Sequence, residues 1–144
     1  MRVVLQRSKS SFVKVKGRVV GSIKYGLVIL VGFSKEDDIN IIDKMIDKII
    51  NIRIFDDESK IMNKSILDIK GEILSVSQFT LYASTAKGRR PSYQDALEST
   101  KAKELYEVFN EKLRNFIKVE TGIFQEDMEV SIVNDGPVTI VLEN

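Results

Sequence analysis

Residues 26–33 read Gly-Leu-Val-Ile-Leu-Val-Gly-Phe, an apolar run without a single charged side chain. A continuous run of this length predicts a buried strand at the centre of a sheet. The segment that follows, from Asp38 to about Ile52, repeats its apolar residues at helical spacing. The repeated residues are Ile42, Met45, Ile46, Ile49 and Ile50. We therefore expect an amphipathic helix over this segment, packed against the sheet.

Further strand-like segments lie on both sides of this pair. They are residues 2–8, 11–16, 18–23, 53–55, 72–79, a strand near Val119, 128–134 and 138–142, with polar loops at 56–59 and 83–91. A second helix is expected from about Ala102 to Ile117, with Leu105, Tyr106, Phe109, Leu113 and Phe116 on one face. The chain of 144 residues shows no linker or repeat, so residues 1–144 are predicted to form a single domain. The expected fold class is α+β: a largely antiparallel sheet that curls toward a barrel, with two main helices packed on it.

The chain has no histidine and no cysteine. A Ser-His-Asp triad, a Cys-His pair, a disulfide and the common zinc sites are therefore excluded. The adjacent acids at 37–38 and 56–58 do not have the spacing of a calcium loop. We expect neither a metal nor a cofactor, and hydrolytic chemistry would have to use hydroxyls, lysines, carboxylates, backbone amides or the substrate itself.

The formal net charge is only +1. Proteins that coat duplex nucleic acid are strongly basic, so DNA is not an expected partner, whereas contact with a few phosphates at the end of an RNA remains open. No apolar run approaches the roughly 18 residues of a membrane span. Because cysteines are also absent, a cytoplasmic location is the expectation.

Residues 77–80, Ser-Gln-Phe-Thr, lie where a predicted strand ends and a polar loop begins. If the chain turns there, the backbone N–H groups of Phe79 and Thr80 are candidate oxyanion donors. The plainer interpretation is a strand end whose hydroxyls satisfy the turn backbone. Thr80 is also a candidate nucleophile, but a threonine needs a general base beside it and the sequence places none there.

Residues 134–139 read Asn-Asp-Gly-Pro-Val-Thr, and Pro137 is one of only two prolines in the chain. Proline removes a donor from the sheet ladder, and bonds that precede proline are those that can be cis. We therefore expect Pro137 to interrupt what would otherwise be one strand from Met128 to Leu142. Asn, Asp, Gly and Pro are equally typical of a plain turn.

The two motifs together closely resemble the signatures of the D-aminoacyl-tRNA deacylase family, namely Ser-Gln-Xaa-Thr-Leu at 77–81 and Asn-Xaa-Gly-Pro-Xaa-Thr at 134–139. The resemblance runs nearly end to end and includes Gly88, Arg90, Pro91 and Ser92 of a Gly-Xaa-Arg-Pro-Ser stretch. It implies an enzyme that hydrolyses the ester of D-aminoacyl-tRNA, with mischarged glycyl-tRNA as a further substrate. Tyr82 and Tyr93 depart from the residues that are commoner in the family, but neither lies in a motif core.

The resemblance also implies a homodimer in which a cis Gly136-Pro137 pair from one subunit enters the active site of the other. Two rigid carbonyls against the substrate α-carbon would leave space for hydrogen but not for an L side chain, a filter that rejects by clash. The implied catalytic pocket is Ser77, Gln78, Phe79 and Thr80, acting chiefly through main-chain contacts. The neighbouring 2′-hydroxyl of the tRNA would activate water.

Several residues are candidates for binding the aminoacylated CCA end of tRNA. They are Lys87, Arg89 and Arg90 for phosphates, Phe124 and Met128 for the terminal adenine, and Asn134 beside the Gly-Pro pair. A solvated basic loop and ordinary core packing are the plainer interpretations of the first two groups. Ser92, with Asp95 three residues later, fits a helix N-cap.

Two rival functions remain open. One is a non-catalytic module that binds tRNA ends or dimerises on the same scaffold. The other is a small-ester hydrolase that uses Thr80 as its nucleophile and does not recognise RNA. The cationic loop disfavours this second alternative.

Overall fold

The computed structural model describes all residues, 1–144. The helices are α1 (Ile39–Asn51) and α2 (Ser99–Arg114), with a short 3₁₀ turn η1 (Phe79–Tyr82) between them. The strands are β1 (Arg2–Ser8), β2 (Ser11–Val15), β3 (Arg18–Ile23), β4 (Gly26–Gly32), β5 (Phe55–Asp56), β6 (Met62–Lys64), β7 (Glu72–Ser77), β8 (Lys118–Thr121), β9 (Glu129–Ser131) and β10 (Asn134–Glu143).

A five-stranded sheet in the order β10-β1-β4-β7-β8 forms the centre of the molecule. The predicted buried strand, β4, is its middle member, antiparallel to β1 and parallel to β7. Strand β8 continues the parallel arrangement, whereas β10 is antiparallel to β1 at the other edge. Because β4 and β7 are parallel, their carboxyl ends meet at one end of the sheet, with Val31 paired to Ser77.

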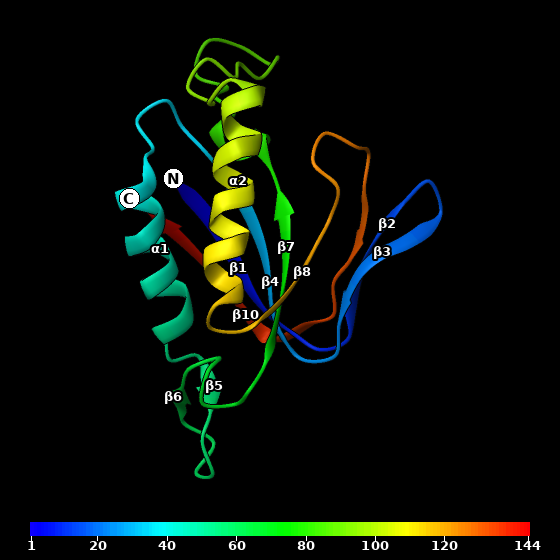
Figure 1. The fold of residues 1–144 in the computed structure, drawn as a ribbon, viewed down its shortest axis with the longest axis vertical. Coiled ribbons are helices and arrows are strands. Elements are labelled where there is room, and N and C mark those ends of the chain that lie inside the picture. The colour runs from blue at the N-terminus through cyan, green and yellow to red at the C-terminus, as the bar shows by residue number, and fades with distance from the viewer.

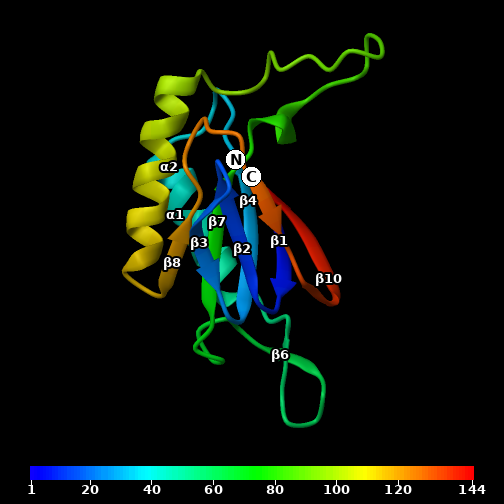
Figure 2. The ribbon, with the colours of Figure 1, turned by 90° about the vertical axis from the view of Figure 1, so that its right-hand side faces the viewer.

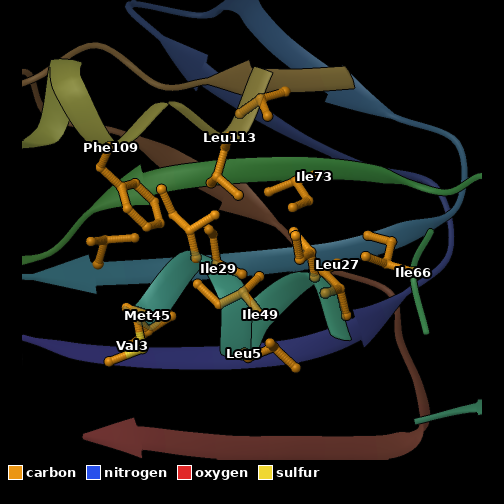
Figure 3. Packing of buried hydrophobic residues seen from close by; sticks show 14 of the residues in the cluster. Val3, Leu5, Leu27, Ile29, Met45, Ile49, Ile66, Ile73, Phe109 and Leu113 are labelled. Atoms are coloured by element: carbon orange, nitrogen blue, oxygen red, sulfur yellow. The ribbon is translucent and has the colours of Figure 1, made fainter. Parts of the chain in front are cut away.

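Both helices cover one face of this sheet and lie side by side (Figure 1). Helix α1 begins after Asp38, whose side chain accepts a hydrogen bond from the Ile41 N–H at 2.9 Å. The five residues predicted for its apolar face are all buried. Figure 3 shows side chains of the sheet, including Leu27 and Ile73, packed against Ile49 of α1 and against Phe109 and Leu113 of α2.

A second sheet, in the order β3-β2-β9, forms a separate layer. A smaller apolar cluster joins it to the five-stranded sheet, and its members are Val13, Ile23, Val28, Leu74 and Val76. Most neighbouring strands are antiparallel, and the sheets curl without closing into a barrel. The predicted α+β class, with two helices on a largely antiparallel sheet, is confirmed. Neither helix is both long and apolar enough to cross a membrane.

Some local predictions were wrong. Helix α2 begins at Ser99 after the N-cap Glu98, so Ser92 is not a cap; Ser92 instead exchanges two 2.8 Å backbone hydrogen bonds with Ser84. Phe116 is 56% exposed because α2 ends at Arg114, before the position that would bury it.

The strand boundaries also differ in two places. Pro137 lies inside β10, but the pairing of β10 with β1 is interrupted around it: Gln6 pairs with Thr139 and Ser8 with Asn134, so residues 135–138 have no partner in the ladder. The expected strand is also broken earlier, between β9 and β10. The strand expected at residues 53–55 is only β5, which pairs with β6, a strand that the sequence did not indicate.

Candidate active site

The segment from β7 into η1 places the Ser-Gln-Phe-Thr motif at the carboxyl end of the sheet. Strand β7 is buried as far as Val76, and the N–H of Gln78 donates to the carbonyl of Val31 at 2.7 Å. The chain then leaves the ladder and turns through η1. The first N–H groups of such a turn have no partner inside it, so those of Phe79 and Thr80 are the candidate oxyanion donors.

The side chains of the motif differ in exposure. Ser77 and Gln78 are half-buried, whereas Thr80 is exposed and Phe79 is 59% exposed. The side-chain amide of Gln78 donates to the Thr80 hydroxyl oxygen. An amide cannot accept a proton at neutral pH, so the group that contacts Thr80 is not a general base. This arrangement favours a backbone role for the motif over a threonine nucleophile.

A cavity of about 570 Å³ opens beside the motif. Its lining residues are Val76, Ser77, Gln78, Phe79, Leu97, Ser99, Ala102, Phe124, Gln125, Glu126, Asp127, Met128 and Val130. They come from the end of β7 and the start of η1, from the start of α2 and Leu97 just before it, from the segment between β8 and β9, and from β9 itself. Five of the predicted site residues therefore meet in one place: Ser77, Gln78 and Phe79 on one side and Phe124 and Met128 on the other.

The start of α2 is the part of this wall that the sequence reasoning missed. Ser99 and Ala102 line the cavity, but α2 was expected to begin only at Ala102. The Glu98 carboxylate accepts hydrogen bonds from the N–H groups of Thr100 and Lys101, at 2.9 and 3.3 Å. These bonds lower the pKa of Glu98 and occupy two of the free N–H groups of the helix terminus. Apolar periodicity does not define the first residue of a helix to better than a few positions, so the three-residue difference is expected.

The opposite wall joins apolar and acidic groups. Phe124 packs on the ring of Tyr106, with centroids 5.9 Å apart, and the next residue, Gln125, has a positive φ of 64°. Glu126 forms an ion pair with Lys16 at 3.0 Å. A non-glycine residue in the left-handed region is uncommon and marks a loop held by its surroundings.

Tyr106 supports the cavity from beneath. Its hydroxyl donates to the carbonyl of Ser75 at 2.8 Å, which ties α2 to β7 two residues before the motif. Burial of the ring raises the pKa of Tyr106, so the hydroxyl stays protonated and remains a donor throughout the neutral range.

Arg2 and Gly32 hold the turn from the other side, and neither was singled out in the sequence. The guanidinium of Arg2 donates to the carbonyl of Leu81 and lies 4.9 Å from the ring centroid of Tyr82. Burial is the main cause that raises the pKa of Tyr82. A β-carbon added to Gly32 would lie 2.9 Å from the carbonyl oxygen of Gln78, so only glycine lets the turn approach β4 this closely. Such contacts depend on pairing between distant segments, which leaves no local signal.

The predicted phosphate ligands Lys87, Arg89 and Arg90 do not line the cavity. They are exposed on the segment between η1 and α2, which projects beyond the end of the sheet (Figure 2). The structure therefore places the three cations outside the cavity, beyond the motif.

Asn134, Gly136 and Pro137 lie at the opposite end of the sheet. Asn134 pairs with Ser8 of β1, whereas the level of Ser77 corresponds to Val3. Five residues along the strands and three strand spacings across the sheet separate Ser77 from Asn134 by roughly 20 Å. Gly136 and Pro137 are exposed, and the peptide bond between them is cis. Within one chain, this pair cannot reach the cavity.

The described chain has no group of three or more acidic side chains arranged to hold a metal ion. The polar lining of the cavity consists of hydroxyl, amide and carboxylate side chains.

Comparison with known proteins identifies close relatives. The chain is 54% identical to a D-aminoacyl-tRNA deacylase of Aquifex aeolicus (strain VF5) over 145 aligned residues, which cover 100% of this chain and 98% of the relative. It is 52% identical to a D-aminoacyl-tRNA deacylase of Bacillus mycoides (strain KBAB4), covering 100% and 99%.

Two solved structures share the fold. A protein named c-Myc DNA Unwinding Element Binding Protein is 40% identical with a TM-score of 0.95, covering 100% of this chain and 99% of that one. A probable eukaryotic D-amino acid tRNA deacylase is 19% identical with a TM-score of 0.83, covering 98% and 97%, and at that identity it supports the fold alone. The family model described as D-Tyr-tRNA(Tyr) deacylase matches residues 4–143. The family predicted from the two motifs is thus confirmed: the chain belongs to the D-Tyr-tRNA(Tyr) deacylase family.

Proposed function

We propose that this protein hydrolyses the ester bond of D-aminoacyl-tRNA and releases free tRNA and the D-amino acid. The observation that carries the proposal is the cavity at the carboxyl end of β7, where Ser77, Gln78 and Phe79 face Phe124 and Met128. A volume of about 570 Å³ lies within the range of small-ligand sites and is ample for an aminoacyl ester with part of its adenosine.

The chemistry is assigned to the backbone and the substrate. The Phe79 and Thr80 N–H groups would stabilise the oxyanion that forms when water attacks the ester carbonyl. The 2′-hydroxyl beside the ester would position that water and relay its proton to the 3′ oxygen of ribose, because the chain has no histidine and the Thr80 hydroxyl is hydrogen-bonded to an amide. The ribose then leaves as an alcohol, and the amino acid departs as its carboxylate.

Chirality would be read by Gly136 and Pro137 of a second copy of the chain. The supporting observation is their position: they are exposed and roughly 20 Å from the cavity of their own chain by strand spacing. In a homodimer, this rigid pair would stand over the substrate α-carbon and exclude an L side chain. Because glycine has no side chain, glycyl-tRNA is expected to be cleaved as well.

The remaining candidate residues would bind successive parts of the tRNA 3′ end. Phe124 and Met128 would bind the terminal adenine inside the cavity, and Lys87, Arg89 and Arg90 would meet phosphates outside it. Asn134 would support the Gly-Pro pair, since its amide donates to the Thr139 hydroxyl at 3.0 Å across that segment. Because the proposed substrate takes part in translation, the protein would act in the cytoplasm.

Two rivals are separable by experiment. A tRNA-end-binding or dimerisation module would bind without cleaving, and an RNA-indifferent esterase would cleave a free D-amino-acid ester. One structural relative is named for binding to a DNA element, but the net charge of +1 does not favour such binding here.

The test is hydrolysis of D-tyrosyl-tRNA and L-tyrosyl-tRNA by the purified protein, with D-tyrosine ethyl ester as the comparison. We expect cleavage of the D-aminoacyl-tRNA alone. Cleavage of the ethyl ester would favour the RNA-indifferent esterase, and cleavage of none would favour the binding module. Thr80→Ala should keep activity within about tenfold because it retains the backbone N–H groups; a Thr80→Ala protein that binds but does not turn over would return the nucleophile role to Thr80.

A further inference from the structure

Two exposed aromatic rings form a pair at the mouth of the cavity. Phe79 and Tyr93 are 59% and 40% exposed. Their ring centroids are 5.0 Å apart at an interplanar angle of 61°, an edge-to-face contact. The two rings thus support each other while much of their surface faces solvent, which is unusual for side chains that serve only the core.

The pair continues the wall of the cavity outward. Phe79 lines the cavity, and Tyr93 contacts Phe79 but is not itself a lining residue. If the last residue of a polymeric ligand occupies the cavity, the residue before it would therefore contact the Tyr93 ring.

The backbone on both sides of Tyr93 is held in place. Before it, Ser84 and Ser92 exchange two 2.8 Å hydrogen bonds, which close the base of the projecting loop. After it, the N–H of Ala96 donates to the Tyr93 carbonyl at 3.1 Å, and the N–H of Leu97 donates to the Phe33 carbonyl at 2.9 Å. Tyr93 is therefore an exposed ring on an anchored segment.

Positive charge lies on the loop that directly precedes Tyr93 in the chain. Lys87, Arg89 and Arg90 all fall between Ser84 and Ser92, in the loop that this pair of hydrogen bonds closes. Aromatic rings followed by cations are the combination that binds single-stranded nucleic acid: bases stack on the rings and phosphates meet the cations.

We propose that Phe79 and Tyr93 form a stacking site for the nucleobase next to the terminal adenosine of the substrate. This inference rests on the proposed function, because it assumes that the adenosine ester occupies the cavity. It adds a second subsite that accepts the base through its flat face, so any base in that place would be tolerated.

The test compares three D-tyrosyl esters: of adenosine, of the dinucleotide cytidylyl-adenosine, and of the same dinucleotide with an abasic sugar in place of cytidine. For the wild type, the added cytidine should raise kcat/KM by about tenfold, in line with stacking of one base, and the abasic sugar should not.

The variants are Tyr93→Leu, Tyr93→Phe and a control, Phe116→Leu. Phe116 is also an exposed aromatic residue, at 56%, but it lies beyond the end of α2 beside Ile46 and Ile50 of α1, away from both motifs. Tyr93→Leu should remove the gain from cytidine and leave cleavage of the adenosine ester unchanged. Tyr93→Phe and Phe116→Leu should keep the gain.

The contrary results are distinct. If Tyr93→Leu lowered kcat/KM equally on the adenosine and dinucleotide esters, Tyr93 would only support the turn that carries Phe79, and the proposal would be overturned. A gain that survives in Tyr93→Leu, or that the abasic sugar supplies equally well, would also overturn it, the latter in favour of phosphate contact. Failure of the wild type to cleave any of the three esters would contradict the proposed function itself.

Discussion

At the scale of single residues, the turn that carries the Ser-Gln-Phe-Thr motif depends on glycine in the strand beside it. Gly32 is buried, and a β-carbon there would lie 2.9 Å from the Gln78 carbonyl oxygen and 3.1 Å from the Leu81 β-carbon. The conformation of this turn therefore depends on Gly32 as well as on the motif residues, because the turn occupies the space that a side chain at position 32 would fill.

Gly32→Ala should displace the turn and lower kcat more than it raises KM, by tenfold or more, because oxyanion donors lose effect with small misplacements. Steady-state kinetics on D-tyrosyl-tRNA measure this. Gly71→Ala is the matched control: its added carbon would lie 2.9 Å from Ile66, at the opposite end of β7. Equal kinetic losses in both variants would show that the effect is general strain and not displacement of the turn.

At the scale of elements, one carboxylate joins three strand ends. Glu72 at the start of β7 accepts hydrogen bonds from the Lys24 N–H at 2.7 Å and from the Lys118 ammonium at 3.0 Å. The first of these is the main cause that lowers the pKa of Glu72, and the lysine lowers it further. The side chain is 21% exposed, so solvent screens the interaction only in part.

Because the folded-state pKa of Glu72 is lowered, its contribution to stability is present above the unfolded-state value of about 4.3 and is lost as the pH falls through the folded-state pKa. Glu72→Gln should lower the free energy of unfolding by about 1–2 kcal/mol at neutral pH and by less in acid. Urea unfolding at several pH values measures both.

The control for that series is Glu129→Gln, whose side chain is 74% exposed and whose only ion pair, with Lys14, is 4.0 Å long. It should change little at any pH. A Glu72→Gln deficit that stays constant down to strongly acidic pH would contradict the linkage.

The elements that could be predicted from sequence are those specified by their own residues. Strand β4 and helix α1 follow from an unbroken apolar run and a helical repeat, and both were predicted correctly. Ser92 has an equally good local signal for a helix cap, but its backbone pairs with Ser84 instead. The parallel pairing of β4 with β7, which brings the cavity walls together, has no local signature.

Some residues of the candidate site could likewise be predicted from sequence, and others could not. The motif Ser77–Thr80 could be selected from sequence because it resembles a signature of a known family. Phe124 and Met128 could be selected because an aromatic and an apolar side chain suit the binding of a nucleobase. Ser99 and Gly32 could not, because their roles arise from packing between segments that are distant in sequence.

At the scale of the whole molecule, the rigidity of the site rests on the core between the sheet and the two helices. Phe109 of α2 is fully buried there, while Phe116, beyond the end of α2, is 56% exposed. Phe109→Ala should lower the free energy of unfolding by about 3–5 kcal/mol, and Phe116→Ala should stay within about 0.5 kcal/mol of the wild type. Denaturant unfolding measures the pair; similar losses in both would mean that the core is not organised around α2 as described.

The placement of the two motifs at opposite ends of the sheet also makes the assembly testable. If Gly136 and Pro137 of one chain complete the cavity of another, the discrimination against L-tyrosyl-tRNA should require the dimer. Sedimentation combined with activity at the same dilution measures this, and a monomer that still cleaves only the D-ester would exclude the shared site.

The most direct measurement for the chemistry is cleavage of D-tyrosyl-tRNA whose terminal 2′-hydroxyl is replaced by hydrogen. With no histidine in the chain and an amide as the hydrogen-bond partner of the Thr80 hydroxyl, the 2′-hydroxyl of the substrate is assigned the part of a proton relay from the attacking water to the leaving 3′ oxygen. Removal of that hydroxyl should slow cleavage by at least about 10²-fold, the lower end of general acid–base catalysis, while binding is retained. Cleavage at the unmodified rate would contradict RNA-assisted catalysis and assign the reaction to Thr80.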